Sequence, residues 1–497
     1  MSRINTNVES LIARRAIGLN NASLNEALER LSTGLRINTG KDDPAGLIAS
    51  ETLRSGIRAI STAIDNANRA DTIVAVAEGG LQEISSLLLE LENLIDQTAN
   101  ESGLTPEEVK ANQLQIDTIL QSINRLAEAT AFGDKKLLNG TFDFTTSGIN
   151  INQPTGATLS HLAKTQINTA KIPAGAYRNV VINVVARSQV AYVSAVLAGT
   201  TGTGTNQRNG TLGDPTTIQV RGNYGAEVLS FASGTTTANI ATAINASKEL
   251  TGVSATASAA TGGPASLLLQ STTYGSDAFV SVSVLENATT AFSAQPADKS
   301  DYGVDGTVTV NGTNAVVTGL DASVRTGGLS LDVTLTPTFG GSTGGTTSFQ
   351  ILGGGAVFSI SPTVGLSGQE SVGMQEVSAA KLGNASVGYL ATLGSGLTND
   401  LSSKKFATAQ RIVRAAISQI GSLRGRLGAF QKDTLGTTIN SLQVARENVT
   451  AAESAIRDAD FAVETSNLTR AQILVTSSTQ VLQLANAQPQ NVLSLLQ

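Results

Sequence analysis

Residues 24–35 read Leu-Asn-Glu-Ala-Leu-Glu-Arg-Leu-Ser-Thr-Gly-Leu, with leucines at positions 24, 28, 31 and 35. Spacings of four, three and four residues are the a/d rhythm of a coiled-coil seam. A helix with one apolar stripe cannot bury that stripe alone in water, so it needs a partner helix. We therefore predict a pairing helix near the N-terminus, with Leu24, Leu28, Leu31 and Leu35 as its seam.

Similar stripes follow at both ends of the chain. Beyond a break at residues 40–46, apolar residues recur at helical spacing over about six heptads, from Leu53 to Ile95. Thr105-Pro106-Glu107-Glu108 has the N-cap, the first-turn proline and the capping-box glutamate of a helix start. In the last hundred residues the stripe is carried by Ile412, Ala416, Ile420, Leu423, Leu427 and Phe430, then by Leu442, Ala445 and Val449, and finally by Leu468, Val475 and Leu482.

The middle of the chain, residues 141–399, has the pattern of strands and turns. Short alternating or continuous apolar segments are separated by clusters of Gly, Asn and Thr. They are 217–220, 227–231, 266–269, 278–284, 306–310 and 331–335. One short helix is predicted at Thr236–Ser247. The predicted fold class is α+β and multidomain, in which both chain ends form a long α-helical coiled-coil stem and a β-rich outer region is inserted between them.

Composition argues against several kinds of chemistry. The 497 residues include no Cys, no Trp and one His, and the formal net charge is −6. Disulfides and thiolate metal sites are therefore impossible, and nothing favours a cofactor, a metal site or nucleic-acid binding. Asp42 and Asp43 lack neighbouring ligands at calcium-loop spacing and fit the start of a helix better.

Gly340-Gly-Ser-Thr-Gly344 matches the G-x-S-x-G pattern of serine hydrolases. The match lies in a turn-like cluster, however, and not between a strand and a helix, and the only available base is His161. A turn and a packing role are favoured for these residues, so we predict no enzymatic activity.

The sequence has no uninterrupted run of 18 apolar residues, and its first ten residues lack the apolar core of a Sec signal peptide. We therefore expect no membrane-spanning helix, and export, if it occurs, by another route.

Long motifs at both ends resemble those of bacterial flagellin. Residues 31–46, LSTGLRINTGKDDPAG, are similar to its N-terminal signature. Residues 466–474, SNLTRAQIL, and residues 489–496, PQNVLSLL, are similar to its C-terminal signature. In the middle, residues 241–245 and 252–256 resemble a small α/β module found in many flagellins. The resemblance implies a structural subunit that self-assembles into the helical flagellar filament used for swimming.

The resemblance also implies a division into domains. Residues 1–40 and 460–497 would form an inner coiled-coil domain, and 41–140 with 400–459 a rod-like helical domain. Residues 141–399 would form the variable outer region, which we expect to hold two modules at about 180–290 and 300–399. By the same resemblance, the chain would be secreted to the extracellular filament, and its partners would be further copies of itself, an export chaperone, the filament cap and the hook-junction proteins.

Residues at both ends are candidates for the assembly seam. We expect Leu24, Leu28, Leu31 and Leu35 to face Leu468, Val475 and Leu482, with Leu493 and Leu496 in the apolar C-terminal tip. The same stripes fit a seam within one chain, which is compatible with polymer formation. Arg411, Arg414, Arg424 and Arg426 are expected to pair with carboxylates across the rod or between subunits.

One flagellin site differs in charge here. The segment that the flagellin-sensing Toll-like receptor contacts corresponds to Leu89-Glu-Leu-Glu-Asn-Leu94. Glu90 and Glu92 stand where the family has arginines, next to Leu89, Asn93 and Leu94. Because an arginine fork is replaced by negative charge, we expect recognition by that receptor to be weak or absent.

Two alternatives remain open from the sequence. A hook–filament junction protein would share the terminal helices but would form a short ring in place of long fibres. In the other alternative, the outer region acts as an adhesin or carries a grafted enzyme, and the helical stem serves only to display it.

Overall fold

The structure is a computed structural model that describes residues 6–100, 103–148, 161–173, 175–197, 211–212, 214–258, 266–286, 292–295, 300–384 and 387–495. The chain forms two compact units. The first comprises Met1–Arg69, Ser359–Val364 and Leu435–Gln497, and the second comprises Ala70–Phe358 and Gly365–Thr434.

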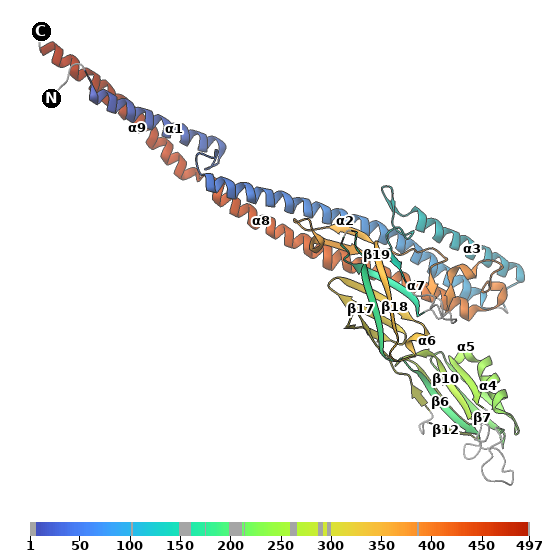
Figure 1. Cartoon of the computed structure of the whole chain (residues 1–497). Helices are drawn as coiled ribbons and strands as arrows, with labels where there is room; N and C mark the ends of the chain where they lie inside the picture. The colour runs from blue at the N-terminus through green and yellow to red at the C-terminus, as the bar shows by residue number, and fades with distance from the viewer. Residues whose placement is uncertain are drawn as a thin grey trace. The chain divides into compact units, whose positions relative to one another are not determined.

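The first unit is built from helices of both chain ends. They are α1 (Val8–Thr33), the beginning of α2 (Pro44–Thr98), α8 (Thr437–Arg457) and α9 (Phe461–Leu495). Asn7 caps α1 by accepting a hydrogen bond from the Ser10 N–H at 3.0 Å, and Gly34 ends it in the left-handed conformation. Figure 1 shows α1 and α9 side by side. The predicted pairing of the two chain ends is therefore present within a single chain.

Between the α1–α9 pair and the α2–α8 pair, the segment that follows α1 is hydrogen-bonded to the end of α8 and the segment that follows it. The Arg36 N–H donates to the Arg457 carbonyl at 2.7 Å, and the Ala459 N–H donates to the Gly34 carbonyl at 2.9 Å. Beyond these contacts, Asp43 directly precedes α2 and accepts a hydrogen bond from the Gly46 N–H at 2.9 Å, which is the predicted helix-start role.

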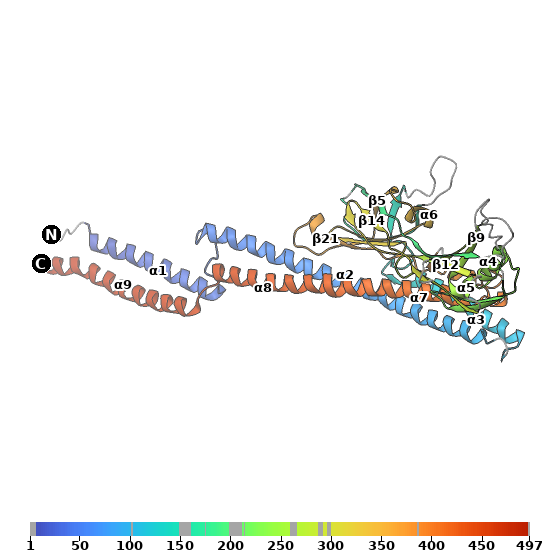
Figure 2. The ribbon, with the colours of Figure 1, turned by 90° about the horizontal axis from the view of Figure 1, so that it is seen from below.

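In the second unit, α2 continues beside α3 (Pro106–Ala129) and α7 (Phe406–Ala429), as Figures 1 and 2 both show. The predicted stripes are the buried faces of these helices, and Val74, Ala77, Leu81, Ile84, Leu88, Leu91, Ile95, Ile412, Ala416, Ile420 and Leu427 have no exposed surface. The predicted start of α3 is confirmed, since Thr105 and Glu108 form a complete capping box. A seven-residue π-helix, Phe430–Gly436, joins α7 to α8 and was not predicted.

The β region has two hydrophobic cores, each between two antiparallel sheets. The first core lies between the sheet β15-β14-β5-β19-β3 and the sheet β16-β17-β18-β4. Their strands are β3 (Phe144–Ser147), β4 (Leu162–Ala170), β5 (Arg178–Ala186), β14 (Thr307–Val310), β15 (Thr313–Asn314), β16 (Val316–Thr318), β17 (Asp321–Thr326), β18 (Leu329–Leu335) and β19 (Thr346–Gly354).

The second core lies between the sheets β12-β6-β10-β9 and β13-β11-β7-β8, with α4 packed on it. These elements are β6 (Val190–Leu197), β7 (Thr216–Gly222), β8 (Ala226–Phe231), α4 (Thr237–Ala246), β9 (Val253–Ser258), β10 (Ser266–Tyr274), β11 (Phe279–Glu286), β12 (Phe292–Gln295) and β13 (Ser300–Tyr302). The predicted strands and the predicted short helix are confirmed.

The predicted module boundaries need correction. The expected module at about 180–290 begins with β5, but β5 pairs with β14 and β19, and its Val180, Ile182 and Val184 are fully buried in the first core. The second module instead runs from β6 at residue 190 to β13 at residue 302, and the module expected at about 300–399 also includes β3, β4 and β5. The pairing partners of β5 lie more than one module away in sequence, which alternation alone cannot reveal.

The two ends of the β insertion meet beside α3. The Val377 N–H donates to the Leu138 carbonyl at 3.1 Å, and Gln113 of α3 bridges Leu393 and Leu401 through its amide group at 2.9 and 2.8 Å. The chain thus leaves the helical stem and returns to it at one place, as predicted.

By length and composition alone, α2 is long and apolar enough to cross a membrane. The core helix of a soluble protein can have the same length and composition. The fully buried residues of α2 all recur at helical spacing on one face, which is the pattern of a helix packed against protein.

Candidate assembly surface

The α1–α9 pair is antiparallel and is fixed by polar contacts along its seam. Asn20 Nδ2 donates to Ser478 Oγ at 2.5 Å, and Asn7 Nδ2 donates to the Ala485 carbonyl at 2.8 Å. Arg30 Nη1 lies 3.3 Å from Glu464 Oε1, and Glu464 is only 6% exposed. Polar pairs inside an apolar seam favour one register over others, because any slip leaves a buried polar group without its partner.

The buried apolar residues of this seam are small. Ala13, Ala27, Ala471 and Ala485 are its buried apolar residues. Five of the predicted leucine and valine positions are half-buried on the same faces or beside them: Leu24, Leu31, Leu468, Val475 and Leu482.

Leu28 is 45% exposed, so the α1–α9 contact within one chain leaves much of it uncovered, and its place in an assembly seam stays a prediction. Leu35 falls beyond the end of α1, half-buried in a bridge to Asp458. The regular spacing of large leucines obscured the stripe that contains Ala13 and Ala27. Leu493 lies within α9, but its side chain is outside the described part of the structure, as is the whole of Leu496.

Both helices carry a second apolar stripe that faces away from the seam. Its large side chains are 45–65% exposed, and they are Val8, Leu11, Ile12 and Leu19 on α1 and Ile473, Leu474, Val481 and Leu484 on α9. In the antiparallel pair these two sets lie along the same stretch, because Asn7 contacts Ala485 and Asn20 contacts Ser478. Residues 471–495 include no charged side chain. Such a cluster of exposed, charge-poor apolar surface marks an interaction site.

The segment 89–94 on α2 divides between exposed and buried positions. Leu89 is 51% exposed and Glu90 and Asn93 are also exposed, whereas Leu94 is buried. Glu92 accepts a hydrogen bond from Arg414 Nε at 2.7 Å, so its carboxylate is engaged with α7. This contact holds the pKa of the Arg414 guanidinium above its ordinary value.

Three of the four arginines of α7 form the expected ion pairs within the chain. Arg414 pairs with Glu92, Arg424 lies 3.6 Å from Glu78, and Arg411 pairs with Glu249. Arg426 differs from the other three arginines. Burial lowers the pKa of its guanidinium to about 10. The Gln166 amide oxygen, turned toward it, accepts hydrogen bonds from Nη1 and Nη2 at 3.0 and 2.7 Å.

The hydrolase-like residues have packing roles. The His161 ring stacks on Phe339 with centroids 4.6 Å apart, and Ser342 Oγ donates to the Thr338 carbonyl at 2.8 Å in the turn after α6 (Pro337–Gly340). Among the described residues, no hydrogen bond joins the side chains of His161 and Ser342.

Comparisons with known proteins find matches to both ends and to the middle of the chain. Residues 4–143 match the bacterial flagellin N-terminal helical region, residues 411–496 its C-terminal helical region, and residues 217–273 the flagellin hook IN motif. Flagellin B of Helicobacter pylori is 28% identical over 541 aligned residues, which cover 100% of this chain and 99% of that protein. B-type flagellin of Pseudomonas aeruginosa is also 28% identical, with 99% of each chain covered. The chain belongs to the bacterial flagellin family.

Flagellins are the structural subunits of the flagellar filament, and this flagellin is a filament subunit. The motif match at 217–273 contains α4 and β9, the module identified from its sequence. Among solved structures, FlgL of Xanthomonas campestris is similar over 80% of this chain and 98% of its own, at 14% identity and a TM-score of 0.26. The flagellar cap protein FliD of Bdellovibrio bacteriovorus is similar over 35% and 92%, at 17% identity and the same score. Scores this low support no inference about this flagellin.

Proposed function

We propose that this flagellin assembles into a homopolymer through the exposed apolar stripes of α1 and α9. The supporting observation is that each helix carries two stripes, of which the partner helix in the same chain covers one. The eight large side chains of the other stripe, between Val8 and Leu19 and between Ile473 and Leu484, are 45–65% exposed. Burying one Leu or Ile contributes ~1.5–3 kcal/mol, so eight such residues provide a large driving force even after ordering entropy is subtracted.

The contact is heterologous in this proposal. The stripe of one copy meets a different surface of the next, and because the rotation does not close, a helical fibre grows. Residues 1–40 and 460–497 then form the inner domain, residues 41–140 and 400–459 the surrounding rod, and 141–399 the outer region. The predicted seam, including Leu28, Leu493 and Leu496, takes its remaining contacts from neighbouring copies.

Membership of the family extends the proposal to location and partners. The filament is extracellular, so the chain is secreted, and an export chaperone, the filament cap and the hook-junction proteins are its partners. The role is structural and not enzymatic, which is in keeping with the turn position of Ser342.

We also propose weak recognition by the flagellin-sensing Toll-like receptor. Glu90 is exposed where the family presents a basic residue, and Glu92 is held by Arg414. Purified monomer should activate reporter cells far less than a flagellin with the arginines. Activation at full strength would contradict this.

The assembly proposal is tested by electron microscopy of purified chain seeded with short filament fragments. The wild-type chain should give long fibres. A chain without residues 460–497 and the double variant Ile473→Glu/Leu484→Glu should give none, because the stripe is removed or charged. Gln472→Glu is the control, since it places a single negative charge on an exposed position of α9 away from the stripe, and it should grow fibres.

Circular dichroism checks that the double variant keeps its helices. Fibres from Ile473→Glu/Leu484→Glu at the wild-type rate would overturn the proposal. Short rings from the wild-type chain would point to a junction protein.

A further inference from the structure

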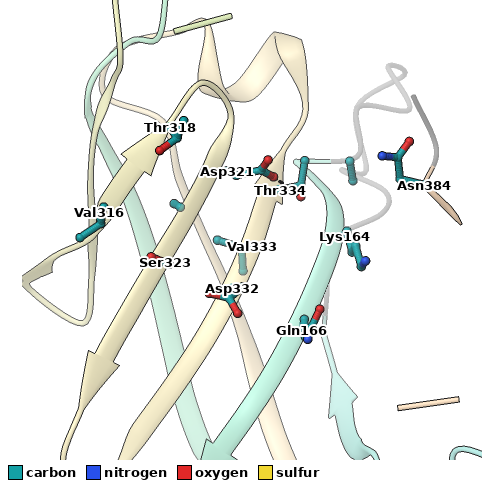
Figure 3. A pocket seen from close by; sticks show the side chains of 12 residues that line it. Lys164, Gln166, Val316, Thr318, Asp321, Ser323, Asp332, Val333, Thr334 and Asn384 are labelled. Atoms are coloured by element: carbon teal, nitrogen blue, oxygen red, sulfur yellow. Dashed lines mark hydrogen bonds between the residues drawn. The ribbon is translucent and has the colours of Figure 1, made fainter. Parts of the chain in front are cut away.

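A polar cleft lies within the second unit, between the outer face of the sheet β16-β17-β18-β4 and helix α7. Two adjoining cavities of about 420 and 340 Å³ form it, and both are lined by Lys164, Gln166, Asp332 and Asn384. Figure 3 shows Lys164 and Gln166 on one strand, Asp332 and Thr334 on the next, and Asn384 on the same side as Lys164. The wall on α7 consists of Ala415, Ser418, Gln419, Ser422 and Arg426.

The carboxylates of the cleft are already engaged. Asp332 accepts from Arg325 Nη2 at 2.7 Å and from Asn168 Nδ2 at 2.8 Å. Asp321 accepts from Thr334 Oγ1 at 2.5 Å.

Two cations are less well compensated. The Lys164 amine makes no hydrogen bond or ion pair among those described. Burial lowers the pKa of this amine, and the Asp321 charge acts in the opposite direction. Arg426 is bonded by the neutral Gln166 amide, while its buried Nε has no hydrogen-bond partner. Asp143 and Asp332 act on Arg426 only through space. Buried donors that lack acceptors are costly, so a ligand supplying acceptor oxygens would be stabilised here.

We propose that the larger cavity of this cleft binds an acidic monosaccharide, with the carboxylate at Lys164, which lines both cavities, and the hydroxyls at Thr318, Asp321 and Ser323. Arg426 adds positive charge from the adjoining cavity. A singly charged group fits better than a phosphate dianion, because Asp321 and Asp332 also line the site. The larger cavity has the size that a single sugar residue needs. No described residue of the terminal helices α1 and α9 lines either cavity.

The test is ligand-observed NMR and calorimetry on the full-length chain, with D-glucuronate and D-glucose as a pair that differs only in the carboxylate. Glucuronate should bind saturably and glucose roughly tenfold more weakly or not at all. Lys164→Met should weaken glucuronate binding by about the same factor. Lys171→Met is the control, because Lys171 lies next to β4 but pairs with Glu370 and lines neither cavity.

Equal melting temperatures for the two variants exclude misfolding as the cause. The proposal is wrong if glucuronate does not bind, if glucose binds as well, if Lys164→Met has no effect, or if inorganic phosphate competes as effectively as glucuronate. A disaccharide that ends in glucuronate distinguishes two sources of the bound sugar, the end of a glycan and the free monosaccharide. Tighter binding than free glucuronate would assign the cleft to glycan ends, and equal binding would assign it to the free sugar, with both results supporting the site.

Discussion

Replacing Arg30 by Leu should destabilise the α1–α9 pair by about 3 kcal/mol. Among the residues that the structure describes, Arg30 is the only cation paired with Glu464, whose side chain is 8% exposed. That carboxylate also accepts a 3.5 Å hydrogen bond from Asn467. The variant therefore leaves a buried charge without its counter-ion. The reverse change, Glu464→Leu, should cost about 1 kcal/mol, since the Arg30 side chain is 24% exposed and keeps its 2.6 Å ion pair with Glu26.

Amide hydrogen exchange across α1 and α9 of the purified chain measures both effects. Arg30→Leu should speed exchange roughly a hundredfold. Glu26→Gln is the matched control, because it removes only the exposed ion pair between Arg30 and Glu26. This change should alter the stability by about 0.5 kcal/mol or less. The double variant Arg30→Leu/Glu464→Leu should return to within about 1 kcal/mol of wild type. A double variant as unstable as Arg30→Leu alone would refute the reasoning.

Two further changes test other parts of the fold. Gly275→Ala should destabilise the β region by about 2–4 kcal/mol in urea unfolding, because Gly275 has φ +93° and a Cβ there would overlap Asp305 Oδ1 and the Gly319 backbone; Gly327→Ala, with open space around it, should change little. Thr105→Ala should loosen the start of α3 by about 1 kcal/mol, seen as faster amide exchange there. Hydrogen bonds from Thr105 hold the pKa of Glu108 below its ordinary value. The stability that the Glu108 carboxylate gives to the start of α3 is therefore present above the ordinary glutamate pKa and is lost as the pH falls through the lowered pKa. An acid titration in which the amides of the first turn of α3 stay protected throughout would contradict that assignment.

The helices could be predicted from the sequence wherever large apolar residues set the period. The stripes of α2 and α7 are buried as expected, and the capping motif at Thr105 marks the true start of α3. The α1 seam was only partly predicted. Ala13 and Ala27 are its buried residues, and small side chains give a weak periodic signal beside exposed Leu28.

Features that depend on distant residues could not be read from spacing. The strand β5 joins its sheet through β14 and β19, which lie beyond the whole second module. The polar cleft is assembled from β4, β17, β18 and α7, so that Lys164 and Arg426 share no local motif. The π-helix at Phe430–Gly436 has no glycine or proline at its start that would mark it.

The exposure of Leu28 and the assembly proposal have the same physical origin. A helix that needed only one partner would hide its large apolar residues in the seam and expose polar ones. In α1 and α9 the buried apolar residues of the seam are alanines, and many of the large apolar side chains face outward. The polar pairs Asn20–Ser478 and Arg30–Glu464 then decide which outward residues of the two helices lie next to each other. A slip of one heptad would keep an apolar seam but would separate Leu11 and Leu19 from Ile473 and Leu484. The buried ion pair therefore stabilises one register, and in the assembly proposed above that register defines the surface offered to the next copy.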